Sequence, residues 1–197
     1  MPLDTYPITP VPSFDVLYSE EFKTIVSTFL GANEQRQSTM RFPKRTRALP
    51  YDVLDISTEW YLIRDFYRKN RGGWIAFWFL DFDQRKITDE YMGRGTGAAL
   101  TLDLHSKTTV AASYAIYEDS VLQVENTDYT FVSGGGEAGV DRITWIAGHY
   151  PALGALITSD FKGYLRMKMV MGDKFSGRWF SPKYDKLEII PLREVQW

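Results

Sequence analysis

Residues 60–82, WYLIRDFYRKNRGGWIAFWFLDF, change their hydrophobic period at the glycine pair Gly72–Gly73. Before the pair, apolar side chains recur at spacings of four, three and four residues, which is typical of one face of an α-helix. This face consists of Ile56, Trp60, Ile63 and Tyr67. After the pair, residues 74–80 are apolar at every position, which is typical of a strand buried on both sides. The stretch therefore predicts one helix that leads directly into a buried strand.

The ends of this helix carry their own signals. Asp55 or Ser57 is placed to cap the first turn through a side-chain oxygen. The last turn is basic, which the negative end of the helix dipole favours, and Gly72 can adopt the left-handed conformation that ends a helix. We expect a capped helix that ends near Gly72 and a strand that begins at Trp74.

Most of the remaining sequence has strand patterns. Residues 22–30 are rich in β-branched side chains, residues 36–47 form a basic and weakly alternating stretch, and residues 100–104 alternate cleanly. Further strands are predicted at residues 110–117, 121–125, 129–132, 142–146, 163–170, 174–180 and 187–191. One helix among many strands predicts a mainly β (α+β) fold, a β-sandwich or split barrel with one packed α-helix.

The chain of 197 residues has the length of one domain. Residues 1–14 contain four prolines, at positions 2, 7, 10 and 12, and are expected to form an extended amino-terminal arm. We expect residues 15–197 to form a single β-rich domain. The glycine loop at residues 134–139 lies between two strand patterns, which predicts a long hairpin near residues 121–147.

Composition excludes several classes of protein. The absence of cysteine excludes disulfides, a thiol nucleophile and a cysteine-ligated metal centre. No apolar run approaches the roughly 20 residues that span a bilayer, and the first residues do not resemble a secretory signal, so membrane insertion and export by that route are not expected. A net charge of −2 argues against nonspecific binding of nucleic acid by the whole surface.

The candidate chemical motifs are weak. Residues 93–97, GRGTG, lack the Lys-Ser/Thr of a phosphate-binding loop and precede a strand, so we interpret them as a flexible loop. Acidic side chains near residues 81–90 do not match a calcium loop, and the two histidines, His105 and His149, are too few for a metal site or a triad. We therefore predict no catalytic residue, no cofactor, no metal site and no enzymatic activity.

Recognition is better supported than catalysis. The basic residues near position 40 have three interpretations: a nucleic-acid patch, a solvated strand face, or an edge strand whose charges form salt links to a neighbouring subunit. Aromatic residues near the carboxyl end are of the type that anchors interfaces, although core packing is equally compatible with Trp179. The predicted subunit-interface residues are Arg36, Arg41, Arg45, Arg47, Trp179 and Trp197.

Two parts of the sequence resemble a known family. Residues 31–49, GANEQRQSTMRFPKRTRAL, are followed by one helix and by an aromatic strand after Arg71-Gly72. Later, Asp128-Tyr129-Thr130-Phe131, a glycine loop, residues 141–145 (DRITW), and then Pro151, Gly154 and Ile157-Thr158 follow one another, with a longer glycine loop and an added His149-Tyr150. In order and character this resembles the distal tail proteins of siphophages and gene transfer agents, the Dit-like family.

The resemblance implies a tail-tube-like fold and a structural role in the virion, in a protein made in the cytoplasm of the host bacterium. The family forms a homo-hexameric ring that joins the tail tube protein to the hub or baseplate, and also implies contacts with tape measure and tail fibre proteins. DNA passes through the lumen of such a ring without specific binding. We expect docking through strand edges, the amino-terminal arm and the hairpin at residues 121–146. The alternative is a carbohydrate-binding or glycan-degrading tail-tip module.

Overall fold

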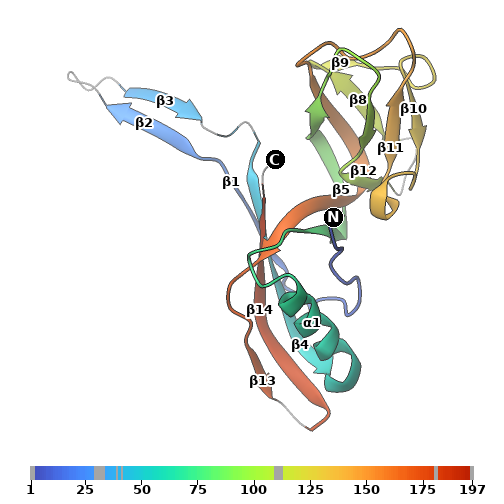
Figure 1. Ribbon diagram of the computed structural model, residues 1–197. Coiled ribbons are helices and arrows are strands. Elements are labelled where there is room, and N and C mark those ends of the chain that lie inside the picture. The colour runs from blue at the N-terminus through green and yellow to red at the C-terminus, as the bar shows by residue number, and fades with distance from the viewer. Residues whose placement is uncertain are drawn as a thin grey trace. The chain divides into compact units, whose positions relative to one another are not determined.

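The computed structural model describes residues 3–28, 34–38, 40, 42–108, 113–179 and 182–195. In this part of the chain it confirms a mainly β fold with one packed α-helix (Figure 1). The chain divides into two compact units. The first unit comprises Met1–Trp78 and Lys168–Trp197, and the second unit comprises Phe79–Met167.

The first unit is built on a long antiparallel strand pair. β4 (Lys44–Asp55) lies between β1 (Leu17–Glu21) and β14 (Tyr184–Glu194), and β13 (Gly177–Trp179) pairs with β14. Burial alternates along β4, with Leu49 and Tyr51 on the buried face. A separate two-stranded hairpin is formed by β2 (Thr24–Thr28) and β3 (Glu34–Ser38).

The helix begins where the sequence predicts. The Asp55 carboxylate accepts a hydrogen bond from the N–H of Ser57 (2.8 Å), while Glu59 accepts one from the N–H of Asp55 (2.9 Å), so the cap is reciprocal. The first turn is a π-helix (η1, Ile56–Trp60) and continues as α1 (Tyr61–Lys69). Ile63 is fully buried. The helix ends at Lys69 with Asn70 as its cap, and Arg71 and Gly72 follow in the left-handed region at φ values of 52° and 60°, so the turn expected at Gly72 begins one residue earlier.

The strand after the helix begins three residues later than predicted. β5 (Phe77–Arg94) starts at Phe77, whereas the side chain of Trp74 is 79% exposed. The reason is that the Trp74 N–H donates to the carbonyl of Arg71 and the Ile75 N–H donates to the carbonyl of Asn70. These bonds use residues 74 and 75 to complete the turn that follows the helix.

The described part of the amino-terminal segment packs against the first unit. Tyr6 is buried, its N–H donates to the Trp78 carbonyl (2.7 Å), and the Trp78 N–H donates to the Asp4 carbonyl (2.7 Å). The Tyr6 ring lies 5.3 Å from the ring of Phe66, and its hydroxyl is 3.0 Å from the hydroxyl of Tyr51. Burial raises the pKa of Tyr51 to about 12, an effect that the hydrogen bond with Tyr6 opposes. The extended segment thus has a buried anchor.

This anchor leads to a testable expectation. Replacing Tyr6 by Phe keeps the ring contacts and removes one buried hydrogen bond, so we expect Tyr6→Phe to lower the free energy of unfolding by about 1 to 2 kcal/mol. Urea denaturation measures this loss. Tyr18→Phe, at an exposed tyrosine of β1, is the matched control and should change stability by less than about 0.5 kcal/mol. Equal losses in the two variants would contradict an anchoring role for the Tyr6 hydroxyl.

The second unit contains the rest of β5 and the short strands that follow. These are β6 (Thr101–Asp103), β7 (Ser106–Thr108), β8 (Ala115–Glu118), β9 (Val121–Leu122), β10 (Tyr129–Val132) and β11 (Arg142–Trp145), with a 3-10 turn η3 (Glu137–Gly139). β12 (Leu156–Met171) pairs with β5, β7 and β8, and it is buried along most of its length. β9 pairs with β8, while β10, β11 and β6 form a separate antiparallel sheet.

The glycine loop between β10 and β11 is held by two carboxylates. Asp141 is fully buried and accepts hydrogen bonds from the hydroxyls of Ser133 (3.2 Å) and Ser106 (3.0 Å) and from the Gly134 N–H (3.1 Å). Asp103 accepts from the Glu137 N–H (2.9 Å). Asp141 directly precedes β11, and Asp103 is the last residue of β6. Their hydrogen bonds hold the loop residues Ser133, Gly134 and Glu137 in a fixed conformation.

Asp103 also gives this loop a pH dependence. Partial burial raises the pKa of Asp103, but hydrogen bonds from Arg142 (2.6 Å) and from the Glu137 N–H, together with the charges of Arg142 and Arg166, outweigh it and lower the pKa below its ordinary value. The Asp103 carboxylate therefore binds a proton more readily in the unfolded chain than in the folded protein. Its contribution to the free energy of unfolding is complete above about pH 4, the ordinary pKa, and is lost as the pH falls through the lower pKa of the folded state.

We therefore expect Asp103→Asn to lower the free energy of unfolding at pH 7 by about 1 to 2 kcal/mol. The difference from the unsubstituted protein should narrow as the pH is lowered below about 4, because protonation removes the same charge. Urea denaturation at several pH values measures both effects. Glu125→Gln, at an exposed carboxylate of the second unit, serves as the control. A difference that stays constant down to pH 3 would contradict this assignment.

Candidate subunit-docking surface

The β2–β3 hairpin is exposed along both of its strands. All ten residues of its two strands are exposed, and among the described strands β2 and β3 pair only with each other. Figure 1 shows them extending away from β4 and β14. Two-stranded hairpins are marginally stable in water unless another surface covers them. An uncovered hairpin of this kind is therefore expected to bind a partner.

The side chains of β2 strengthen this expectation. Ile25 and Val26 are neighbours, so they point to opposite faces of the hairpin, and they are 48% and 50% exposed. Opposite them in the register lie Gln37 and Arg36. Adjacent apolar residues are typical of strands buried on both faces. β2 thus presents one exposed apolar side chain on each face of the hairpin, without a cover from the described part of its own chain, while β3 is polar throughout.

A groove lies on the outer surface of the first unit. It has a volume of about 640 Å³, and its apolar lining includes Phe14, which is 97% exposed, and Leu17. Its other lining residues are Asp15, Pro50, Asp52, Lys186, Leu187, Glu188 and Ile189. Isolated exposed apolar residues are ordinary on protein surfaces, but a group of them around a depression is typical of a binding site.

Two bulges between β4 and β14 build this groove. Asp185 pairs with Leu54 and Leu187 with Tyr51, so β4 contains one extra residue there, and Asp52 and Val53 both become exposed. In the next interval the extra residue is on β14, and Glu188 and Ile189 are both exposed. A bulge breaks the alternation of inward and outward side chains. It thereby turns the apolar side chains of Val53 and Ile189 toward solvent.

The groove carries more negative than positive charge. Asp15, Asp52 and Glu188 contribute carboxylates, and Lys186 contributes the one cation among its lining residues. The Lys186 ammonium lies 2.5 Å from Asp52, and its hydrogen bond and charge lower the pKa of that carboxyl. A partner that fits this groove is expected to combine apolar and basic side chains.

Comparison with known proteins does not identify the docking surface. No protein-family model matches the chain, and no characterised protein sequence matches it significantly. Among the described helices, none has the length and apolar character needed to cross a membrane. The functional argument therefore depends on the geometry of the described residues.

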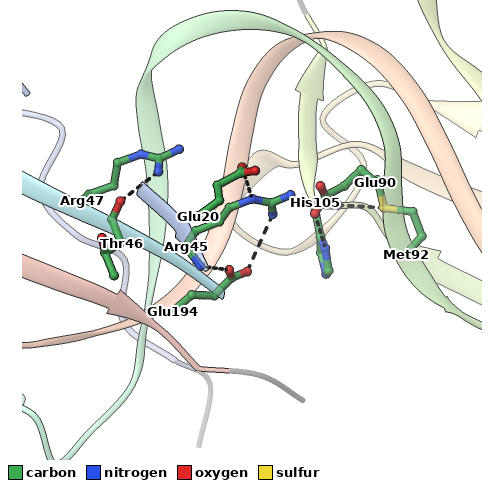
Figure 2. A network of polar contacts seen from close by, with 8 residues as sticks. All are labelled: Glu20, Arg45, Thr46, Arg47, Glu90, Met92, His105 and Glu194. Atoms are coloured by element: carbon green, nitrogen blue, oxygen red, sulfur yellow. Dashed lines mark hydrogen bonds and ion pairs between the residues drawn. The ribbon is translucent and has the colours of Figure 1, made fainter. Parts of the chain in front are cut away.

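Arg45, one of the predicted interface residues, contacts two carboxylates of its own subunit (Figure 2). Its Nε lies 3.2 Å from Glu20 on β1, and its backbone N–H donates to Glu194 on β14 (2.9 Å). The Arg45 side chain is only 12% exposed. This arginine joins three adjacent strands of the first unit, and its role between subunits stays a prediction.

Arg47 is more deeply buried than Arg45. Its Nη1 donates to the carbonyl of Thr46 (3.0 Å), as Figure 2 shows, and its guanidinium lies 5.8 Å from the centre of the Tyr18 ring. Arg36, in contrast, is exposed on β3 and forms an ion pair with Glu34 (3.0 Å). The structure therefore places Arg36 on the hairpin, in a different sheet from Arg45 and Arg47. The prediction of one basic strand over residues 36–47 is wrong, because β3 ends at Ser38 and β4 begins at Lys44.

The other predicted interface residues lie partly outside the described structure. Arg41 and Trp197 are outside the described residues, and Trp179 ends β13 without a described side chain. The sequence interpretation missed Phe14, Leu17 and Ile189, which line the groove. Phe14 was the one with a sequence signal, since aromatic residues such as Phe are enriched in protein interfaces.

The remaining chemical motifs have structural roles. The Nδ1 of His105 lies 3.7 Å from Glu90, and the backbone N–H of His105 donates to the sulfur of Met92, as Figure 2 shows. The Nδ1 of His149 lies 2.8 Å from Asp128. Each histidine thus has a carboxylate neighbour. In the described part of the chain, no group of three or more histidine or carboxylate side chains is arranged to hold a metal ion.

The loop at residues 93–97 is fixed rather than flexible. The Gly95 N–H donates to the carbonyl of Ala155 (2.8 Å), and the Gly97 N–H donates to the carbonyl of Pro151 (3.0 Å). A side chain at Gly95 would collide with the carbonyl of Ala152, which explains the glycine. Since these N–H groups already have protein acceptors, the loop does not present them to a phosphate.

Proposed function

We propose that this protein is a structural component of a bacteriophage tail tip, a distal tail protein whose copies form a ring between the tail tube and the hub or baseplate. The observation that carries the proposal is the β2–β3 hairpin, which is exposed on both faces and bears one apolar side chain on each, Ile25 on one face and Val26 on the other. Such an element gains stability only when another surface covers it. A ring of identical subunits provides that surface at every position.

The family resemblance supports the same function. The Glu34-Gln35-Arg36 triplet, one of the two most specific parts of the resemblance, lies on β3 of this hairpin. The helix and the aromatic strand that follow in the resemblance correspond to α1 and β5. One of the motifs that carry the likeness thus lies on the element that we propose to bind the neighbouring subunit.

In this role the work of the protein is geometric. Six copies close into a ring that stacks on the tail tube protein, and its other face receives the hub or baseplate, with tape measure and tail fibre proteins as further neighbours. The protein is made in the host cytoplasm and belongs to the virion, and DNA passes through the lumen without specific contacts. No catalytic step is part of this proposal.

The carbohydrate-binding alternative has less support. Glycan binding sites use rows of exposed aromatic side chains, and among the described residues of the second unit Tyr150 is the one aromatic side chain in the group of large exposed hydrophobic residues. In the first unit the exposed aromatic residues lie on several different elements, including Phe14, Tyr18 and Trp74. No described row of aromatic side chains favours a glycan.

The native mass of the purified protein tests the proposal. We expect light scattering over a concentration series to show a species of about six subunits, because closed cyclic symmetry gives a defined stoichiometry. The fraction of this species should increase with protein concentration. A single monomeric species at every concentration, with and without the purified tail tube protein, would contradict the proposal.

A further inference from the structure

The hairpin and the groove of the first unit are complementary surfaces that do not cover each other within one chain. The residues of β2 and β3 are exposed, and so are Phe14, Leu17 and Ile189 at the groove. We propose that the groove of one subunit receives the β2–β3 hairpin of the neighbouring subunit. This inference rests on the proposed ring and names the two surfaces that would form its contact.

The apolar parts of the two surfaces match in kind. The hairpin presents Ile25 and Val26, and Phe22 just before β2 is also exposed. The groove presents an almost fully exposed Phe14 and an Ile189 that is 54% exposed. Its volume of about 640 Å³ is in the range of sites that enclose several large side chains. Insertion of hairpin side chains would remove apolar surface from water on both subunits.

The charges also match. Within the hairpin strands the charges of Arg36 and Glu34 form an ion pair, and Lys23, directly before β2, adds one cation at the base of the hairpin. The groove has an excess of carboxylates, among them Asp15 and Glu188. Complementary charges of this type favour the correct encounter and orientation of two surfaces. The carboxylates of the groove favour a segment with a basic end, such as the base of this hairpin, over an acidic partner or a phosphate.

The symmetry of the contact follows from the two different surfaces that form it, the β2–β3 hairpin and the groove. A hairpin on one subunit and a groove on the next are different surfaces, so the contact is heterologous. A heterologous contact repeats from subunit to subunit and closes into a ring or continues as a filament, depending on its rotation. The contact therefore has the symmetry that the proposed ring needs.

Pairs of introduced cysteines test this contact, since the chain has no cysteine of its own. In the Val26→Cys/Ile189→Cys double variant, a short bismaleimide should join hairpin to groove and give a ladder of covalent oligomers. A cross-linker tolerates more separation than a disulfide, which needs Cα atoms within about 7 Å. The matched control is Val26→Cys/Leu62→Cys, where the second exposed apolar position is on α1. This control pair should give no ladder.

Mixing the two single variants gives a second readout. Val26→Cys mixed with Ile189→Cys should give covalent dimers that contain one chain of each, and neither single variant should give them alone. Far-UV circular dichroism and thermal unfolding show whether each variant is folded.

The outcomes separate the contact from the ring. A ladder that ends at the size measured by light scattering would support both. Covalent products that stop at two chains in the double variant would support the hairpin–groove contact in a reciprocal dimer and overturn the ring. Absence of cross-linking in a protein that still assembles to about six subunits would overturn this inference and leave the proposed function standing. Cross-linking of the control pair to the same extent would also overturn the inference.

Discussion

Replacing residues 24–38 by a short Gly-Ser linker is expected to convert the assembled protein into a folded monomer. In the described structure these strands pair only with each other, so their removal leaves the remaining sheets of the first unit paired. Assembly, in contrast, loses the element that we propose to lie between subunits. Light scattering measures the native mass, and thermal unfolding measures whether the monomer keeps its stability.

Substitution of two hairpin side chains allows the loss of subunit association to be estimated. The Ile25→Ser/Val26→Ser variant removes two half-exposed apolar side chains from the hairpin. Complete burial of such a side chain is worth about 1.5 to 3 kcal/mol, and both are already about half-buried in the monomer, so covering the rest of each is worth about half as much. Each subunit contact should therefore weaken by about 1.5 to 3 kcal/mol, roughly ten- to a hundredfold in the association constant. Substitutions at exposed positions change the stability of the monomer by about 0.5 kcal/mol or less.

The chain offers a control for this pair outside every segment expected to dock. Leu62 on α1 and Leu153 of the second unit are also exposed apolar residues. Leu62→Ser/Leu153→Ser removes a similar amount of apolar side chain without touching the β2–β3 hairpin or residues 121–146. If this control weakened the ring as much as Ile25→Ser/Val26→Ser does, assembly would depend on general surface hydrophobicity, and the specific role of the hairpin would be refuted.

The elements predicted correctly from the sequence are those that local interactions determine. Asp55 caps the helix because its carboxylate reaches the N–H two residues later. Gly72 completes the left-handed turn after the helix, which begins at Arg71, because glycine tolerates a φ of 60°. The predicted start of the next strand, at Trp74, was wrong for a related reason. Its apolar pattern was correct, but hydrogen bonds from Trp74 and Ile75 back to the end of the helix compete with strand pairing.

The candidate docking surface depends on features that one sequence does not display. The groove arises from two bulges in the pairing of β4 with β14, and the register of two strands far apart in the chain determines where such bulges fall. The hairpin was partly predictable, since residues 22–30 have a clear strand composition. Their lack of a covering surface was not, because adjacent apolar residues such as Ile25 and Val26 normally indicate burial on both faces.

The largest effect on folding is expected from Asp141→Ala. Asp141 is fully buried, and its carboxylate accepts hydrogen bonds from Ser106, Ser133 and the Gly134 N–H. Hydrogen bonds to a charged group contribute about 1.5 to 3 kcal/mol each, and the donors left without an acceptor lose further free energy if they stay buried. If the glycine loop rearranges, some of these donors can bind water, which reduces the total cost. We therefore expect Asp141→Ala to lower the free energy of unfolding by about 3 to 5 kcal/mol.

Asp141→Asn separates the contribution of the carboxylate from that of side-chain volume. The amide has the same shape and keeps one acceptor oxygen, so it can retain the hydrogen bonds that one carboxylate oxygen accepts. In place of the other oxygen it has an NH₂ group, which then faces the donor that this oxygen had accepted from. We expect Asp141→Asn to lower the free energy of unfolding by less than Asp141→Ala does. It should lower it by more than Glu125→Ala, a control at an exposed residue of the same unit. Urea denaturation measures stability, and limited proteolysis measures the exposure of residues 133–140. A protease-resistant loop in Asp141→Ala would mean that β10 and β11 hold the loop without the carboxylate, and that the glycine loop is fixed by its own backbone.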